Sequence, residues 1–166
     1  WIMTLLDKEG VKRVEKSLKE FDPKQNVIIL KSSARTASEA ARSLDCEVGA
    51  IVKSLLFKTE KTFTLCLIAG DKKASLSKIK KELNIKDSEM ASAEEVKDIT
   101  GFTIGGVAPI GHLKKINILI DNSLQRFNSL FAAAGHPNCV FKTNFVDLEK
   151  ITNGSIKEII EWNNLS

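Results

Sequence analysis

Four apolar residues early in the chain recur at helical spacing. Val11, Val14, Leu18 and Phe21 follow one another at intervals of three or four residues, and mostly charged side chains fill the positions between them. This spacing places the apolar side chains on one face of an amphipathic helix. Because Pro23 follows almost directly, we expect that helix to end there.

Apolar runs further along the chain predict strands. Residues 51–58 and 62–69 are rich in β-forming side chains, and the polar sequence TEK between them is typical of a hairpin turn. We therefore expect an antiparallel pair in which Lys53 lies on a central strand. Shorter runs predict a buried strand at residues 27–30 and further strands at residues 116–121, 129–133 and 139–143.

Two capping boxes mark the starts of further helices. In each, a hydroxyl can accept from the third helical N–H and a glutamate can reach back, Thr36 with Glu39 and Ser92 with Glu95. We expect the first of these helices to reach residue 44 and the second to end at Gly101. Apolar spacing predicts two more helices, at residues 76–83 and 145–151.

The succession of these elements predicts the fold class. Hairpins and helices follow one another without a regular βαβ repeat, so we expect an α+β fold with a mixed, partly barrel-like sheet flanked by helices. At 166 residues, 43% of them hydrophobic, the chain can build a sizeable core. Because no repeat or interdomain linker interrupts it, we expect residues 1–166 to form a single domain.

Composition narrows the class of protein. The formal charge of +4 and the pI near 8.9 suit a phosphate-rich partner, but a solvated lysine surface would give the same charge. Cys46, Cys66 and Cys139 are odd in number and lack C-x-x-C spacing, so we expect neither disulfides nor a zinc site, and a reducing cytoplasmic location. No apolar run approaches the ~18 to 20 residues of a membrane span, so we expect no membrane contact.

Two small-residue segments and one lysine are the candidate site. Residues 105–112 read GGVAPIGH and residues 132–138 read AAAGHPN, so we expect both to be loops that let a ligand approach the main chain closely. Lys53 interrupts the apolar run of its strand, so its ammonium must either reach water or meet an anionic partner in a pocket. Both alternatives stay open.

The two histidines, His112 and His136, each follow a glycine in one of these segments. Either imidazole could donate to a substrate or make a structural hydrogen bond, and without a nearby carboxylate or cysteine cluster neither is expected to bind metal. The absence of G-x-G-x-x-G, G-x-x-x-x-G-K-[ST] and G-x-S-x-G argues against nucleotide binding and against a serine nucleophile. Cys66 and Cys139 are expected to be core thiols. What remains suits a labile bond that needs positioning and charge stabilisation.

These segments together resemble the YbaK-type aminoacyl-tRNA editing family, which includes the editing insertion of bacterial prolyl-tRNA synthetases and its freestanding relatives. The matching motifs follow one another in chain order within residues 27–154: TASEAA at 36–41, IVKSL at 51–55, GDKK at 70–73, TGFTIGGVAPIGH at 100–112 and AAGHP at 133–137. The resemblance implies a mixed, partly closed sheet with helices around it, and hydrolysis of the ester that joins a wrong amino acid to tRNA.

The resemblance also implies roles for individual residues. Lys53 takes the catalytic position, where its ammonium would stabilise charge or hold the terminal phosphate and ribose. The substrate-binding positions, which include the family's G-x-x-x-P loop, are Thr36, Ser54, Gly105, Gly106, Pro109, Gly111, His112, Ala134, Gly135 and His136. The cations expected to contact tRNA are Lys31, Arg35, Lys72 and Lys73. Neither a metal nor an organic cofactor is implied.

The implied substrate is a small amino acid on the wrong tRNA. An aminoacyl ester is intrinsically reactive and a tRNA ribose hydroxyl can help to activate water, so the protein has to orient, desolvate and polarise. Small side chains at residues 132–135 would admit alanine or a residue of similar size and refuse a larger one. The resemblance thus implies a cytoplasmic enzyme that acts in trans on the tRNA for proline, with tRNA and prolyl-tRNA synthetase as partners. The alternatives are a non-catalytic tRNA- or synthetase-binding module of the same fold and a small-molecule hydrolase that uses the same pocket.

Overall fold

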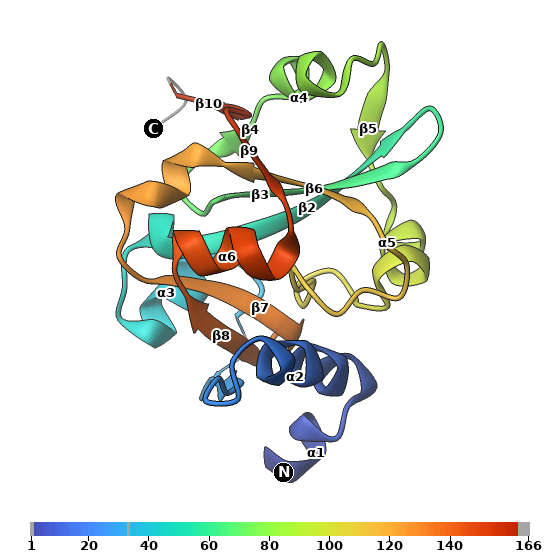
Figure 1. Cartoon of the computed structure of the whole chain (residues 1–166). Coiled ribbons are helices and arrows are strands. Elements are labelled where there is room, and N and C mark those ends of the chain that lie inside the picture. Colours follow the sequence, from blue (N-terminus) through green and yellow to red (C-terminus); the bar gives the residue numbers. More distant parts are fainter. Residues whose placement is uncertain (1, 33, 163–166) are drawn as a thin grey trace.

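The structure is a computed structural model that describes residues 2–32 and 34–162. Within that part of the chain, the strands of an eight-stranded mixed sheet are β1 (Ile28–Ile29), β2 (Ile51–Thr59), β3 (Phe63–Ala69), β5 (Ser88–Met90), β6 (Asn117–Asp121), β7 (Leu130–His136), β8 (Cys139–Thr143) and β9 (Ser155–Lys157). They follow the order β1-β8-β7-β2-β3-β6-β9, and β5 pairs with β2 (Figure 1). A separate pair joins β4 (Lys73–Ala74) to β10 (Ile160–Glu161).

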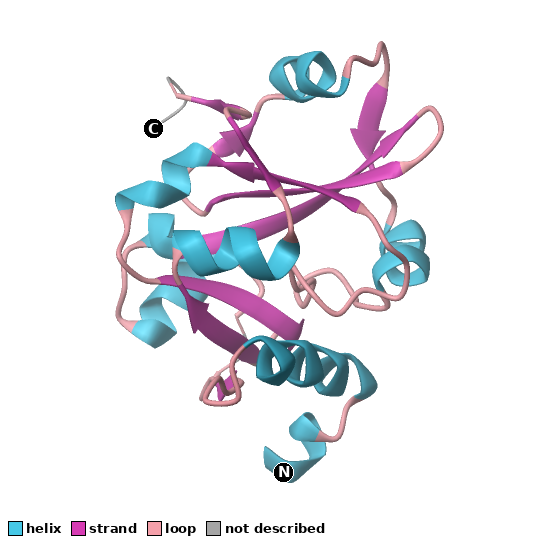
Figure 2. Cartoon of the chain, in the orientation of Figure 1, coloured by secondary structure: helices cyan, strands magenta, loops and turns pink. Residues whose placement is uncertain are grey.

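Helices are arranged around this sheet (Figure 2). They are α1 (Ile2–Leu6), α2 (Glu9–Phe21), α3 (Ala37–Leu44), α4 (Leu76–Leu83), α5 (Ala93–Thr100) and α6 (Phe145–Thr152), with two 3-10 turns, η1 (Val48–Ala50) and η2 (Asn122–Arg126). Both predicted capping boxes form, at Thr36 and at Ser92, and Gly101 ends α5. The predicted α+β class, a mixed sheet flanked by helices, is confirmed. No helix among the described residues has the length and apolar content to cross a bilayer.

The core is centred on β3, which lies between β2 and β6 in the sheet. Its side chains Leu65, Leu67 and Ile68 are fully buried. On one side of the molecule α2 packs against β7 and buries Val11 and Val14, as the apolar spacing predicted. The amphipathic pattern therefore determines which face of α2 meets the sheet.

β2 and β7 separate soon after they meet, and this leaves a gap in the sheet. The two strands pair in parallel only at Ile51 and Val52, whereas β5 covers the same edge of β2 from Phe57 onward. The chain between α5 and β6 lies between the two diverging strands (Figure 1). Lys53 belongs to the stretch of β2 that borders this gap.

Two sequence predictions around this gap are wrong. Residues 132–136 are not a loop, because β7 continues to His136 with an irregularity in its register after Ala133, and only residues 137–138 form a turn. The buried strand predicted at residues 27–30 shrinks to Ile28–Ile29 and is half-buried, because it lies at the edge of the sheet and pairs with β8 alone.

The apolar pattern did not predict α1, β4, β5, β9 or β10. Each of these elements is two to five residues long, which is too short for a periodic pattern to appear. They form because pairing with distant strands or packing on α2 stabilises them. The pair β4–β10 directly follows Lys72, whose carbonyl accepts from the Lys53 ammonium.

Candidate functional site

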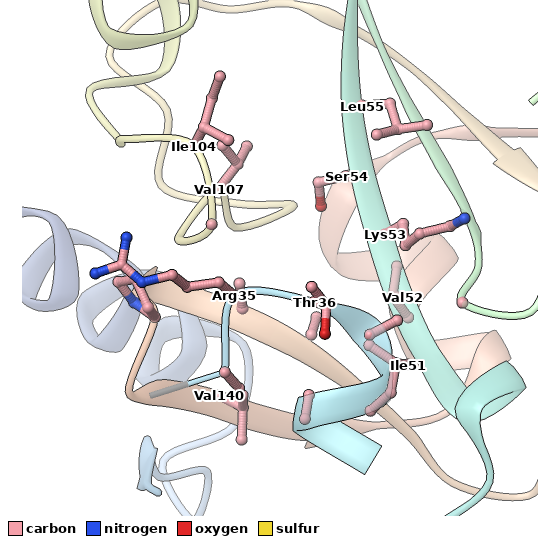
Figure 3. Close-up of a pocket in the computed structure, with 18 of the residues that line it drawn as sticks. Arg35, Thr36, Ile51, Val52, Lys53, Ser54, Leu55, Ile104, Val107 and Val140 are labelled. Carbon is pink, nitrogen blue, oxygen red and sulfur yellow. The ribbon is translucent and has the colours of Figure 1, made fainter. Parts of the chain in front are cut away.

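A cavity of about 480 Å³, here termed the β2–β7 cavity, lies in the gap between these two strands (Figure 3). Its walls come from segments that are far apart in the sequence: the start of α3, β2, the loop at residues 104–107, and β7 with β8. Most of the lining is apolar and includes Val52, Leu56, Ile104, Val107, Ala132 and Val140. The volume falls within the range of about 300–1,000 Å³ that is typical of small-ligand sites.

Lys53 lies at the edge of this cavity. Its side chain is half-buried, and its ammonium donates to the main-chain carbonyl of Lys72. Figure 3 shows the side chain leaving β2 on the side opposite to Ser54. Burial lowers the pKa of Lys53, the Asp71 carboxylate opposes this effect, and the Lys73 ammonium adds to it. The sequence left open whether the ammonium reaches water or meets an anionic partner in a pocket. In the structure it does neither fully: it is half-buried and donates to a main-chain carbonyl.

The turn that accepts from Lys53 is held from several sides. Arg126 donates to both carboxylate oxygens of Asp71, at 2.8 and 3.1 Å, and this pairing lowers the pKa of Asp71. The Lys72 ammonium lies 4.6 Å from the centre of the Trp162 ring, and β10 pairs with β4 directly after the turn. The position of the Lys53 ammonium thus depends on the C-terminal segment as well as on β2.

Two side chains with hydroxyl groups, Thr36 and Ser54, line the β2–β7 cavity and differ in their hydrogen bonding. The Thr36 hydroxyl caps α3, accepting from the Glu39 N–H at 3.1 Å and donating to the Glu39 carboxylate at 3.2 Å. The Ser54 hydroxyl oxygen is buried and has no hydrogen-bond partner among the described residues. Figure 3 shows the Ser54 side chain directed toward the space between Val107 and Thr36. Of the two predicted hydroxyls, Thr36 is engaged in the cap of α3, whereas Ser54 has both its donor and its acceptor capacity to spare.

The loop at residues 104–107 reaches the cavity through Gly105, whose φ of +97° is one that residues with a Cβ rarely adopt. Gly106 lies behind it, where its carbonyl accepts from the Gly135 N–H at 3.0 Å and fastens the loop to β7. Gly135 itself contacts α2, because a Cβ there would come within 2.7 Å of the Gly10 main chain. Of these glycines, Gly105 is the one that the structure brings to the cavity.

Ala134 and His136 stand behind the cavity wall. Ala134 is fully buried in the core, and His136 accepts at Nδ1 from the Asn138 N–H at 3.1 Å. Burial lowers the pKa of His136, and two neighbouring cations lower it further. The wall at this point is formed by Ala133 and Pro137. Neither Ala134 nor His136 therefore lines the cavity that they were predicted to line.

A second cavity, of about 880 Å³ and here termed the α2–α6 cavity, lies between these two helices and the chain that follows Ala108. Pro109, Gly111 and His112 line this cavity. The structure does not bring these three residues to the cavity that Lys53 lines, because the chain turns toward α2 after Ala108. The glycine-rich segment is thus divided between two separate cavities.

Contacts around His112 tie the glycine-rich segment to α2. His112 Nε2 lies 2.7 Å from the Ala108 carbonyl oxygen, and burial lowers the pKa of the ring, so the neutral imidazole donates to that carbonyl. The Phe102 ring meets the imidazole edge-on at 6.0 Å between centroids. Arg13 on α2 donates through Nε to the Gly111 carbonyl at 2.9 Å. These contacts engage Nε2 of His112 within its own loop and hold that loop against α2.

The four cations predicted to contact tRNA differ in exposure. Lys31 and Lys73 are exposed, and Arg35 is exposed beside the β2–β7 cavity. Lys72 is only 5% exposed, because its side chain packs against Trp162. The prediction for Lys72 is therefore corrected: its ammonium is not presented at the surface, and its carbonyl holds Lys53 instead.

Sequence reasoning missed the roles of Asp71, Arg126 and Trp162. Arg126 and Trp162 are separated by many residues from the turn that they hold, and neither belongs to a motif. Asp71 stands in the motif GDKK, where its neighbours drew the prediction instead. The pairing of Asp71 with Arg126 becomes visible only when η2 is placed beside the turn.

The cysteines behave as core residues. Cys66 and Cys139 are fully buried, and burial raises the pKa of their thiols to about 12 and about 11. A thiol with so high a pKa is a poor nucleophile at neutral pH. Among the described residues, no three His, Cys, Asp or Glu side chains are grouped so that they could hold a metal ion.

The chain is similar to known proteins over most of its length. Residues 31–151 match the model of the family described as the aminoacyl-tRNA editing domain. The protein YwhH of Bacillus subtilis is 29% identical over 144 residues, which cover 86% of this chain and 91% of YwhH. The proline–tRNA ligase of Caldicellulosiruptor bescii is 28% identical over 144 residues, which cover 81% of this chain and 25% of the ligase.

A solved structure supports the same relationship. A candidate trans-editing enzyme for prolyl-tRNA synthetase superposes with a TM-score of 0.87 at 34% sequence identity, covering 93% of this chain and 98% of that one. The chain therefore spans a quarter of the length of the ligase, but nearly the whole of this smaller relative.

Proposed function

The chain belongs to the aminoacyl-tRNA editing domain family, and on that premise we propose that it hydrolyses the ester of mischarged aminoacyl-tRNA. The amino acid removed is small, alanine or one of similar size, and the tRNA is the one for proline. The protein acts in trans, with residues 1–166 as one editing domain. Its similarity to a proline–tRNA ligase and to a candidate trans-editing enzyme supports this choice of tRNA and of partner.

The proposed reaction needs no covalent enzyme intermediate. Water adds to the ester carbonyl carbon, the bond from that carbon to the ribose oxygen breaks, and the ribose oxygen takes up a proton from the water. The products are the free amino acid and a tRNA with its terminal hydroxyl restored. Charge that develops on the carbonyl oxygen is best stabilised by a preorganised cation or N–H donors away from bulk water. We assign this task to Lys53, whose ammonium would exchange the Lys72 carbonyl for the substrate.

Apolar walls would set the size limit of the site. Val52, Val107 and Ala132 line the β2–β7 cavity, whose volume of about 480 Å³ has to hold the amino acid and part of the terminal nucleoside. An apolar pocket distinguishes substrates that differ by one methylene by about 1–3 kcal/mol. We therefore expect a graded preference for small residues rather than an absolute one.

One observation carries this proposal. Lys53, the loop at residues 104–107 and the start of α3 converge on one cavity although they are far apart in the sequence. Each comes from a different motif of the editing family. If this chain uses the chemistry of the family, the family motifs have to meet at one site, and here three of them do.

A second candidate function is a non-catalytic module that binds tRNA or the synthetase. The observation in its favour is the Lys53 ammonium, which is engaged by the Lys72 carbonyl and leaves β2 on the side away from Ser54 (Figure 3). In such a module Lys53 would keep this contact when RNA binds. The acceptor end would then be held without turnover.

Deacylation assays distinguish the two candidates. The protein is incubated with proline tRNA charged with alanine, serine, cysteine, 2-aminobutyrate or proline. We expect alanine to be released faster than in buffer, and proline to stay on its tRNA. Release no faster than in buffer for every amino acid, together with salt-sensitive tRNA binding, would reject the deacylase in favour of the binding module.

A further inference from the structure

At Ser54 the main chain of β2 is open toward the β2–β7 cavity. Residues two apart in a strand direct their N–H and C=O groups to the same edge. The Leu56 carbonyl accepts from the Ala91 N–H at 2.9 Å, so Leu56 and Ser54 both face the edge that borders the cavity. On that edge the pairing with β7 stops at Val52, and the pairing with β5 begins at Phe57. Within the described strands, nothing pairs with Ser54 there.

The Ser54 hydroxyl adds a second unused polar group at the same point. Its oxygen is buried and has no partner within the part of the chain that the structure describes. Val52 and Leu56, which share its face of β2, belong to the apolar core. Because buried polar groups are nearly always hydrogen-bonded, a hydroxyl with unused capacity beside a cavity is suited to a ligand group.

Two of the open polar groups at Ser54 suit a ligand donor. The main-chain carbonyl and the hydroxyl oxygen can both accept, and the main-chain N–H on the same edge can donate to an oxygen of the same ligand. An aminoacyl ester carries one strong donor next to its side chain, the α-amino group, which titrates at about pH 7.7–8.0 in its unperturbed form. Lys53 leaves β2 on the opposite side (Figure 3), so its ammonium does not occupy this position.

We propose that Ser54 binds the α-amino group of the amino acid to be removed, through its hydroxyl oxygen and its main-chain carbonyl. The assignment rests on the proposed deacylase function and adds a basis for selectivity to it. Thr36, by contrast, is exposed and already uses its hydroxyl to cap α3. Ser54 therefore selects substrates that carry a free amino group, while the apolar walls select their size.

A comparison of two substrates tests the assignment. Proline tRNA is acylated with alanine or with propionate, which is alanine without its amino group, and kcat/KM is measured for the wild type and for Ser54→Ala. A hydrogen bond to a charged group is worth about tenfold or more in binding. We expect Ser54→Ala to lower kcat/KM about tenfold for alanyl-tRNA and to leave propionyl-tRNA nearly unchanged. The intrinsic difference in ester reactivity cancels in the ratio.

Two further variants guard this comparison. Ser155→Ala removes an exposed serine on β9, and we expect it to leave both substrates unchanged. Ser54→Cys keeps the shape of the side chain, with a somewhat larger sulfur that accepts hydrogen bonds only weakly, so it serves as the test if Ser54→Ala fails to fold and should give the same selective loss on alanyl-tRNA. An equal loss of kcat/KM on both substrates would overturn the assignment of Ser54 to the amino group and would leave the deacylase function standing. No wild-type hydrolysis of either substrate would overturn the deacylase function, and this assignment with it.

Discussion

The β2–β7 cavity and the α2–α6 cavity share one glycine-rich segment but differ in character. Residues 104–107 contribute to the first cavity and residues 109–112 to the second. The first combines apolar walls with the Lys53 ammonium at its border and with a Ser54 hydroxyl that has no partner in the described part of the chain. In the second, the predicted functional group, His112, is turned back to a carbonyl of its own loop.

This difference teaches that an imidazole beside glycines is not in itself a sign of catalysis. Nε2 of His112 is engaged by the Ala108 carbonyl, its ring meets the Phe102 ring edge-on, and its loop holds α2 in place. Ser54 has spare hydrogen-bonding capacity in a cavity. We therefore expect substitutions at the β2–β7 cavity to change catalysis, and substitutions at the α2–α6 cavity to change stability.

The largest effect is expected from Lys53→Ala. Loss of one preorganised group that stabilises the developing negative charge costs about a hundredfold or more in rate, so single-turnover deacylation of alanyl-tRNA should fall by that factor. Lys61→Ala, an exposed lysine in the β2–β3 turn, is the matched control and should retain full activity. Unchanged turnover by a folded Lys53→Ala protein would remove this residue from the mechanism.

A smaller effect is expected when the wall of the β2–β7 cavity is cut back. Ile104 lines the cavity but is 61% exposed, so Ile104→Ala should enlarge the site at little cost in stability. We expect deacylation of leucyl-tRNA to rise about tenfold relative to alanyl-tRNA. Leu113→Ala, which also truncates an exposed apolar residue of this segment, should leave the ratio as it is. A ratio that Ile104→Ala does not change would argue that this wall does not set the size limit.

A shift in pH dependence is expected from Asp71→Asn. If the Lys53 ammonium is the active form, activity falls as pH rises through the Lys53 pKa, which burial holds below its usual value of 10.5. Asp71 raises that pKa, so its neutralisation should lower it and move the alkaline limb of kcat/KM to lower pH. The measurement is a pH–rate profile corrected for spontaneous ester hydrolysis. Asp87→Asn, an exposed acid, should not move the limb, and a limb that Asp71→Asn moves to higher pH would contradict the account.

The smallest effect on catalysis is expected from His112→Ala. This change removes a part-buried hydrogen bond and a ring contact, so we expect a loss of about 1–3 kcal/mol in the free energy of unfolding. At a temperature where the variant is folded, kcat/KM should stay close to that of the wild type. Denaturant unfolding measures the loss of stability, and a deacylation assay on the same sample measures kcat/KM. A large fall in kcat/KM without a loss of stability would place His112 in the reaction and break the comparison.

Local signals predicted much of the fold and part of the site. The capping boxes at Thr36 and Ser92 and the hairpin that carries Lys53 depend on residues close in sequence, and all three formed as predicted. Asp71 and Arg126 are 55 residues apart in the sequence, so no local pattern predicts that they pair.

The loop prediction for the small residues at 132–135 was wrong for a physical reason. They were interpreted as a loop, but they lie in β7, where the close approach of Gly135 to α2 requires a small residue. Composition alone does not distinguish a residue that is small because the chain bends from one that is small because a helix packs on it. The division of the glycine-rich segment between two cavities likewise depends on where α2 lies.

The structure of the protein with a non-hydrolysable alanyl-adenosine, in which an amide replaces the ester, tests the account most directly. We predict that the alanyl group lies in the β2–β7 cavity, with its amino group within hydrogen-bond distance of Ser54. The Lys53 ammonium should have left the Lys72 carbonyl for the carbonyl oxygen of the analogue. An analogue bound in the α2–α6 cavity against His112, or one that leaves Lys53 on Lys72, would contradict it.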